Sequence, residues 1–183
     1  MKNIFSTLFF FLFTALTFAQ INPKNITIAR DQWGVPHIYA ANDAEIAYGL
    51  AWASAEDDFE STQVNLLAVK SKLGGVLGKE GAIFDFFAYA IETIALVDRQ
   101  YETEVSPTFK KVLEGYAEGV NAYAAKHPEE VLAKGIFPIQ PQDILEGYVL
   151  NLTLFSGVHN HIIKILSDQV RRDWMPQGSN GMA

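Results

Sequence analysis

The sequence predicts a mainly helical protein with one β-hairpin near its N-terminus. Apolar residues recur at helical spacing over most of the chain, strand-like alternation is confined to residues 26–40, and an uncharged apolar run precedes both. The 183 residues are 49% hydrophobic and 19% charged, which fits one folded domain and excludes a disordered chain. The net charge of -7 offers no basic face for nucleic acid, and the lack of cysteine excludes disulfides and thiolate chemistry.

Residues 1–19 have the features of a secretory signal peptide. Lys2 gives a positive start, Ile4 to Phe18 is uncharged and apolar, and Thr17 and Ala19 are small residues at the positions a signal peptidase reads. An uncleaved membrane anchor is the alternative, but the run is shorter than the about 20 apolar residues of a spanning helix. We expect cleavage after Ala19 and a periplasmic or secreted protein without a membrane partner.

A hairpin is predicted over Ile26 to Ala40, with turn residues at Asp31 to Gly34. The hydrophobic period then changes from two residues to that of a helix. Asn42 followed by Glu45 resembles a capping box, and it opens a long helix from Asp43 to Lys70.

Glycines interrupt the chain after this helix. Their spacing allows a phosphate-binding loop, but no strand precedes them and no Gly-Lys-Ser/Thr follows, so we expect a loop with positive φ angles. A second helix is predicted from Ala82 to Val97. The glycines are Gly74, Gly75, Gly78 and Gly81.

The clearest helix begins at Ser106-Pro107, because serine is a good N-cap and proline suits the first helical position. It ends near Lys126. The remaining expected segments are a short helix over Glu129 to Lys134, an extended link containing Pro138 and Pro141, a helix from Asp143 to about Phe155 opened by an Asp143/Glu146 cap pair, a break at Gly157 and a further helical stretch to about Arg171.

Three polar groups have both a chemical and a structural interpretation. Glu56-Asp57-Asp58 offers oxygen ligands for calcium, but consecutive side chains on a helix diverge, so structural hydrogen bonds are favoured. His159-Asn160-His161 lacks a third zinc ligand nearby and is expected to be a polar loop. His37 is a candidate base or, more simply, a hydrogen-bonded structural histidine in a strand.

Four segments, taken together, resemble the penicillin acylase family. Arg30 to Ala40 (RDQWGVPHIYA) resembles its opening signature, Ala47 to Phe59 (AYGLAWASAEDDF) its following helix, and Leu113 to Tyr123 (LEGYAEGVNAY) its third block. Gly178-Ser179-Asn180 resembles its maturation junction. The four lie in the family's order and span nearly all of the chain after the signal. The family includes acylases of β-lactams and of N-acyl homoserine lactones.

The resemblance implies an N-terminal-nucleophile hydrolase of the αββα fold, of which this chain is the α-subunit part. The precursor would cut itself between Gly178 and Ser179, which makes Ser179 the catalytic residue. On this interpretation residues 20–178 are the α subunit and a maturation linker, and residues 179–183 begin a truncated β subunit. The partners would be the chain's own β subunit, in an α/β heterodimer, and a small acyl amide.

Counting from Asp143, the resemblance places Leu152, Phe155 and Ser156 near the acyl pocket. An apolar wall there would suit an aromatic or fatty acyl group. Penicillin G acylases hold calcium partly through an α-subunit glutamate, but Ile162 stands at the matching place. We therefore expect no metal ligand there and no cofactor.

The competing interpretation is an exported helical binding protein without catalysis. In such a protein Gly178-Ser179 would be part of an inert Gly/Ser/Asn segment, which is common in loops. The two interpretations differ in the polypeptide that they require after Ser179, because only the acylase needs a large β-rich continuation.

Overall fold

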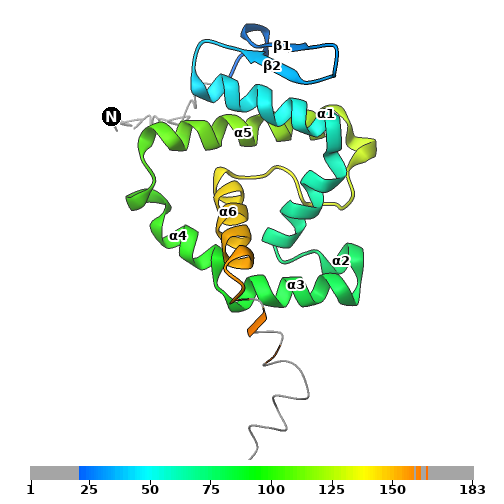
Figure 1. Ribbon diagram of the computed structural model, residues 1–183, viewed down its shortest axis with the longest axis vertical. Coiled ribbons are helices and arrows are strands. Elements are labelled where there is room, and N and C mark those ends of the chain that lie inside the picture. The colour runs from blue at the N-terminus through cyan, green and yellow to red at the C-terminus, as the bar shows by residue number, and fades with distance from the viewer. Residues whose placement is uncertain (1–20, 159, 162–163, 165–183) are drawn as a thin grey trace, which may run out of the picture.

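The computed structural model describes residues 21–158, 160, 161 and 164, and it confirms a mainly helical chain with one hairpin. In Figure 1, α1 and α5 lie side by side under the hairpin, α4 and α3 continue around the molecule, and α6 occupies the middle. The elements are, in order, η1 (Pro23–Asn25), β1 (Thr27–Arg30), β2 (Pro36–Tyr39), α1 (Asp43–Val69), α2 (Gly74–Leu77), α3 (Lys79–Ala90), α4 (Thr93–Glu104), α5 (Pro107–Lys126), η2 (Pro128–Glu130) and α6 (Pro141–Phe155).

The hairpin forms as predicted. Strands β1 and β2 pair antiparallel, with Thr27 opposite Tyr39 and Arg30 opposite Pro36. Asp31 closes the turn because its Oδ1 atom accepts hydrogen bonds from two later backbone amides, and Gly34 supplies the positive φ of 83° that the turn needs.

Helix α1 begins at the predicted cap. The Asn42 side chain accepts a hydrogen bond from the Glu45 amide at 3.0 Å, and the Glu45 carboxylate accepts from the Ala41 amide at 2.9 Å. The helix bends at Asp58, whose φ of −158° and ψ of 80° are not helical. Asp58 acts as an internal cap, because its Oδ1 atom accepts from the Ser61 amide at 2.9 Å.

The main core lies where α1 packs on α5 and on the link that precedes α6. Asn121 of α5 fastens that link, since its amide group accepts from the Ile139 backbone N–H at 2.7 Å and donates to the Ile139 carbonyl at 2.9 Å. The buried residues of this core are Ala51, Ala55, Phe59, Leu66, Leu67, Leu73, Ala117, Val120, Tyr123, Ala124, Ile136 and Ile139.

The predicted single helix from Ala82 to Val97 is wrong, because two helices occupy this region. Helix α3 ends at Ala90, and Glu92 takes a left-handed conformation with φ 54° before α4 begins at Thr93. The two helices pack into different hydrophobic clusters. Phe87 of α3 packs with residues of α1 and α6, whereas Val97 of α4 packs with a residue of α5.

The other differences are local. The glycine segment is not simply a loop: α2 begins at Gly74, and of the four glycines there only Gly78 has a positive φ. The expected short helix over Glu129 to Lys134 is only the 3-10 turn η2. Helix α6 begins two residues before Asp143, because the capping box is formed by Gln140 and Asp143 rather than by Asp143 and Glu146.

The end of α6 agrees with the sequence. The helix stops at Phe155, Gly157 has a φ of 79°, and the described residues Val158, Asn160, His161 and Lys164 are helical again. Within the described residues, no helix combines the length and hydrophobicity that a membrane crossing needs.

Candidate functional site

The three residues assigned to an acyl pocket lie together at the C-terminal end of α6, with Leu152 and Phe155 in its last turn and Ser156 at its C-cap. Their spacing of three and four residues places them on one side of the helix. Leu152 is 68% exposed and Phe155 is 88% exposed, so both side chains are free to contact another surface. The Ser156 hydroxyl donates to the Thr153 carbonyl at 2.6 Å, which fixes it against its own helix.

A groove of about 300 Å³ lies between α6, α1 and α3, and Leu150, Asn151 and Leu154 line it from α6 rather than the three assigned residues. Its walls are mainly apolar, with polar atoms from Asn65, Asn151 and Glu80 among them. Sequence reasoning missed the groove because its walls come from three separated helices. Its apolar lining residues include Val69, Leu73, Phe84, Leu150 and Leu154.

Helix α6 also carries the most perturbed carboxyl group in the described residues. The Asp143 carboxylate pairs with Lys70 Nζ at 2.7 Å and accepts from the Gln140 amide at 2.7 Å. Burial, assisted by the nearby charges of Asp143 and Asp98, raises the pKa of Glu146 to about 7, while Lys70 opposes this rise. The sequence indicated Asp143 and Glu146 only as helix-capping residues.

The acidic residues Glu56, Asp57 and Asp58 on α1 make hydrogen bonds within the fold. Arg30 of β1 reaches Glu56 at 3.2 Å and Asp57 at 2.9 Å, and hydrogen bonds with Asp57 and then Glu56 raise the pKa of its guanidinium. Trp52 Nε1 also donates to Glu56 at 2.8 Å. With Asp58 capping the second half of α1, all three carboxylates make structural hydrogen bonds, as the sequence favoured.

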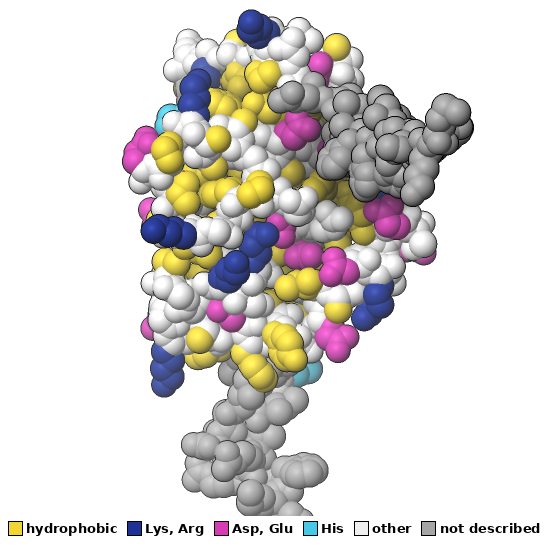
Figure 2. Space-filling model, turned by 180° about the vertical axis from the view of Figure 1, so that it is seen from behind, with side chains coloured by type: hydrophobic (Ala, Val, Ile, Leu, Met, Phe, Trp, Pro, Cys, Tyr) yellow, Lys and Arg dark blue, Asp and Glu magenta, His cyan; other side chains and the backbone are white. Residues whose placement is uncertain are grey.

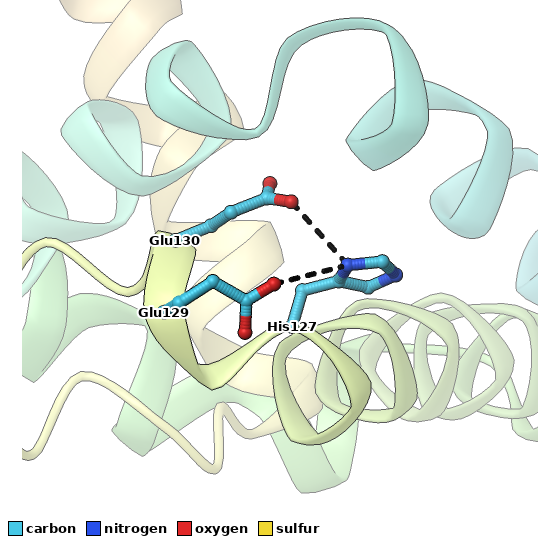
Figure 3. A group of neighbouring side chains, drawn as sticks. All are labelled: His127, Glu129 and Glu130. Atoms are coloured by element: carbon cyan, nitrogen blue, oxygen red, sulfur yellow. Dashed lines mark ion pairs between the residues drawn. The ribbon is translucent and has the colours of Figure 1, made fainter.

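The histidines fall in different surroundings. His37 on β2 is half exposed, and its Nε2 atom lies 3.4 Å from Asp31 Oδ2, as expected of a hydrogen-bonded structural histidine. His127 follows α5 and faces Glu129 and Glu130 of η2 (Figure 3). Sequence reasoning missed this second group, although a His-Pro-Glu-Glu segment stands directly after the predicted helix. His161 lies in the described part of the chain, but its neighbour His159 does not.

The catalytic assignment lies outside the described residues. Gly178, Ser179 and Ile162 all fall there, so their placement stays a prediction from the sequence. What the described structure provides is the end of α6 with exposed apolar side chains, an apolar groove lined by other residues of the same helix, and a buried carboxyl group about two turns earlier.

The sequence of this chain is similar to those of known acylases. The penicillin amidase family model matches residues 25–183. The chain is 30% identical to penicillin G acylase of Escherichia coli over 125 residues, which are 63% of this chain and 14% of that protein. It is 25% identical to acyl-homoserine lactone acylase PvdQ of Pseudomonas fluorescens over 141 residues, or 70% of this chain and 18% of that protein.

The fold matches a solved structure as well. A chain of the thermostable penicillin G acylase from Alcaligenes faecalis aligns with a TM-score of 0.61 at 21% identity, covering 86% of this chain and 95% of that chain. This chain therefore spans less than a fifth of the length of the two curated relatives, yet it accounts for nearly all of one chain in the solved structure. Since the family model covers most of its length, the chain belongs to the penicillin amidase, or penicillin acylase, family.

Proposed function

We propose that this chain is the N-terminal part of an exported acylase precursor whose nucleophile is Ser179. The observation that carries the proposal is the extent of the family match, which runs to residue 183 and so includes Gly178-Ser179-Asn180. The names of the relatives, a penicillin G acylase and an acyl-homoserine lactone acylase, support hydrolysis of an acyl amide.

Maturation begins when the Ser179 hydroxyl attacks the carbonyl carbon of Gly178. The peptide C–N bond breaks as the new C–O bond forms, which leaves an ester between the two residues and frees the α-amine of Ser179. Water then hydrolyses the ester and releases the Gly178 carboxyl group. Glycine at this position adds no side chain, so the attacked carbonyl is open to approach.

The freed α-amine makes Ser179 a nucleophile with its own base. An α-amine has a reference pKa near 8, so about a tenth of it is unprotonated in neutral solution, and this neutral form accepts the hydroxyl proton. The serine oxygen attacks the substrate carbonyl, the amine leaves with a proton, and water hydrolyses the acyl-enzyme ester. Donors that stabilise the oxyanion are needed as well, and in the proposed enzyme they belong to the β subunit.

The acyl group is proposed to lie against the last turn of α6. Leu152 and Phe155 present exposed apolar surface, and Ser156 adds a hydroxyl whose hydrogen is already donated to the backbone. Such a wall suits the apolar acyl part of an N-acyl homoserine lactone or of a β-lactam such as penicillin G. The β subunit would cover the same turn in an α/β heterodimer, a division supported by the 95% coverage of one solved chain.

The test is maturation of the whole precursor, expressed with its natural continuation. Wild type should separate into two chains, the larger beginning at Ser179, and should hydrolyse acyl amides. Ser179→Ala should remain one chain without activity, because no hydroxyl starts the shift. Ser179→Cys should still cut, since a thiol makes the same shift, and should be a poor amidase.

Ser167→Ala is the matched control, because it removes a serine from the same segment without touching the junction. It should mature as wild type does. A larger chain that begins elsewhere, or a Ser179→Ala precursor that matures and hydrolyses amides, would contradict the mechanism. A precursor that neither cuts nor hydrolyses any acyl amide would favour the non-catalytic binding protein.

A further inference from the structure

A cluster of His127, Glu129 and Glu130 lies where α5 passes into η2, and it has no part in the proposed acylase reaction (Figure 3). We propose that these three side chains bind a divalent transition-metal ion, with zinc as the best match. In the described residues this is the one group of three such side chains whose ligand atoms all lie within 4.8 Å of one another.

The separations of the three donors suit a single small ion. His127 Nδ1 lies 3.3 Å from Glu130 Oε1 and 3.7 Å from Glu129 Oε1. Zinc binds nitrogen and oxygen at roughly 2.0–2.2 Å, so two ligands of a tetrahedral ion lie about 3.4 Å apart. The observed distances therefore require only small side-chain movements to close on an ion.

The cluster has more acceptors than its histidine can satisfy. Nδ1 carries at most one hydrogen, yet Glu129 and Glu130 both direct an oxygen at it. The nearest lysine in sequence is Lys126, but its Nζ atom lies over the Trp52 ring, 5.1 Å from the ring centre. A divalent cation in place of the Nδ1 proton would bind both carboxylates at once and neutralise their charge.

The surrounding fold holds these donors in position. The His127 ring stacks on Tyr123, with ring centres 4.3 Å apart and an interplanar angle of 19°. Gln63 is fully buried, and its Nε2 donates to the Glu130 carbonyl at 3.0 Å. Its Oε1 atom accepts from the Leu132 amide at 2.8 Å, so both ends of one side chain fix the turn. The Tyr123 hydroxyl also donates to Glu130 Oε2 at 3.5 Å, and hydrogen bonds of this kind to ligand side chains are typical of metal sites.

The ligand types decide which metal fits. Calcium takes six to eight oxygen ligands, and this cluster offers one imidazole nitrogen and two carboxylates. One nitrogen with carboxylate oxygens is a zinc-type set, with the fourth position left for water. Glu129 is 70% exposed at its side chain, so the ion can enter directly from solvent.

The experiment titrates ZnCl₂ into the metal-free full-length protein by calorimetry, at pH 7.5 in a non-chelating buffer. Wild type should bind one more zinc ion than His127→Gln and Glu129→Gln, or bind it at least ten-fold more tightly. His37→Gln is the matched control, because His37 also pairs with a carboxylate but with only one, and it should bind as wild type does. CaCl₂ should give no site that depends on His127.

Glu129→Gln also distinguishes loss of the metal site from misfolding, because the Glu129 side chain is mostly exposed and its replacement leaves the core unchanged. Cobalt(II) provides a second readout, since its visible spectrum should report a nitrogen and oxygen environment that both substitutions abolish. Equal zinc stoichiometry and affinity in wild type, His127→Gln and Glu129→Gln would overturn the proposal. Loss in His127→Gln alone, with Glu129→Gln unchanged, would overturn it too.

Discussion

Glu146 lies on α6 with only 4% of its surface exposed, close to the ion pair of Lys70 and Asp143. Its ionised form is disfavoured by burial and by two nearby carboxylates, Asp143 and Asp98, and is only partly compensated by Lys70. The folded protein therefore holds this proton up to a pH of about 7, whereas an unfolded chain loses it near 4.5. The stability of the fold must depend on pH between these two values.

Protonation of Glu146 favours the folded state. Between pH 4.5 and about 7 the folded state binds more protons at Glu146 than the unfolded state, so the free energy of unfolding falls as the pH rises. Glu146→Gln cannot ionise, so it should match wild type at pH 4.5 and be more stable by about 1–3 kcal/mol at pH 8. Urea unfolding at both pH values measures the difference.

Glu60→Gln is the control for this measurement, because Glu60 is exposed on α1. Its stability should follow wild type at both pH values. If Glu146→Gln and wild type lose the same stability between pH 4.5 and 8, Glu146 is not the group responsible.

At the scale of elements, α1 and α5 approach so closely that glycine is needed at their contact. Gly115 and Gly119 lie one turn apart on α5 and face the backbone carbonyls of Ala44 and Tyr48 on α1. A Cβ atom on Gly119 would stand 2.5 Å from the Tyr48 oxygen and 2.8 Å from the Ala51 Cβ atom. The tight contact brings the small residues of both helices into one core.

Gly119→Ala should therefore destabilise the protein, even though alanine favours a helix more than glycine does. The helices must separate to admit the methyl group, and overpacking of this kind costs about 1–3 kcal/mol. Thermal unfolding measures the loss. Gly75→Ala in α2 is the control, since its added Cβ meets nothing within 4 Å and should leave the melting temperature equal or higher. Equal melting temperatures for Gly119→Ala and wild type would show that α1 and α5 separate to admit the methyl group without loss of stability.

Helices that begin at a capping residue were predictable from the sequence. The division of one predicted helix into α3 and α4 was not, because it depends on how the two helices pack. Asn42 and Ser106 both cap the helices that the sequence assigned to them. The break at Glu92 has no glycine or proline to announce it, and it arises because α3 and α4 bury their apolar residues in different cores. Tertiary contacts of this kind override local pattern.

The candidate site also combines features that the sequence indicated with features that only the fold reveals. Four ordered segments indicated the family, and the family model confirms it. The assignment of Leu152, Phe155 and Ser156 to an acyl pocket stays a prediction. The groove between α6, α1 and α3 and the raised pKa of Glu146 depend on residues from helices far apart in sequence, so no local pattern could reveal them.

At the scale of the whole molecule, apolar side chains reach the surface in several places (Figure 2). Trp33 and Tyr39 on the hairpin are 78% and 62% exposed, and Tyr89 at the end of α3 is 76% exposed. These residues, with Leu152 and Phe155, lie in two regions, the hairpin and the ends of α3 and α6, at opposite ends of the molecule (Figure 1). In the proposed α/β heterodimer the β subunit would cover the region of Leu152 and Phe155.

The exported protein should begin at Gln20. Residues 1–19 carry one charge, at Lys2, so their removal changes the net charge from -7 to -8. In exporting cells, mass spectrometry of the N-terminal peptide should find Gln20 first, because the small residues Thr17 and Ala19 fit the peptidase. Ala19→Phe should block cutting and keep the protein at the membrane, whereas Ala15→Phe, which only replaces one apolar residue of the run by another, should be processed normally. Exported wild type that retains Met1, or Ala19→Phe cut at the same bond, would refute the assignment.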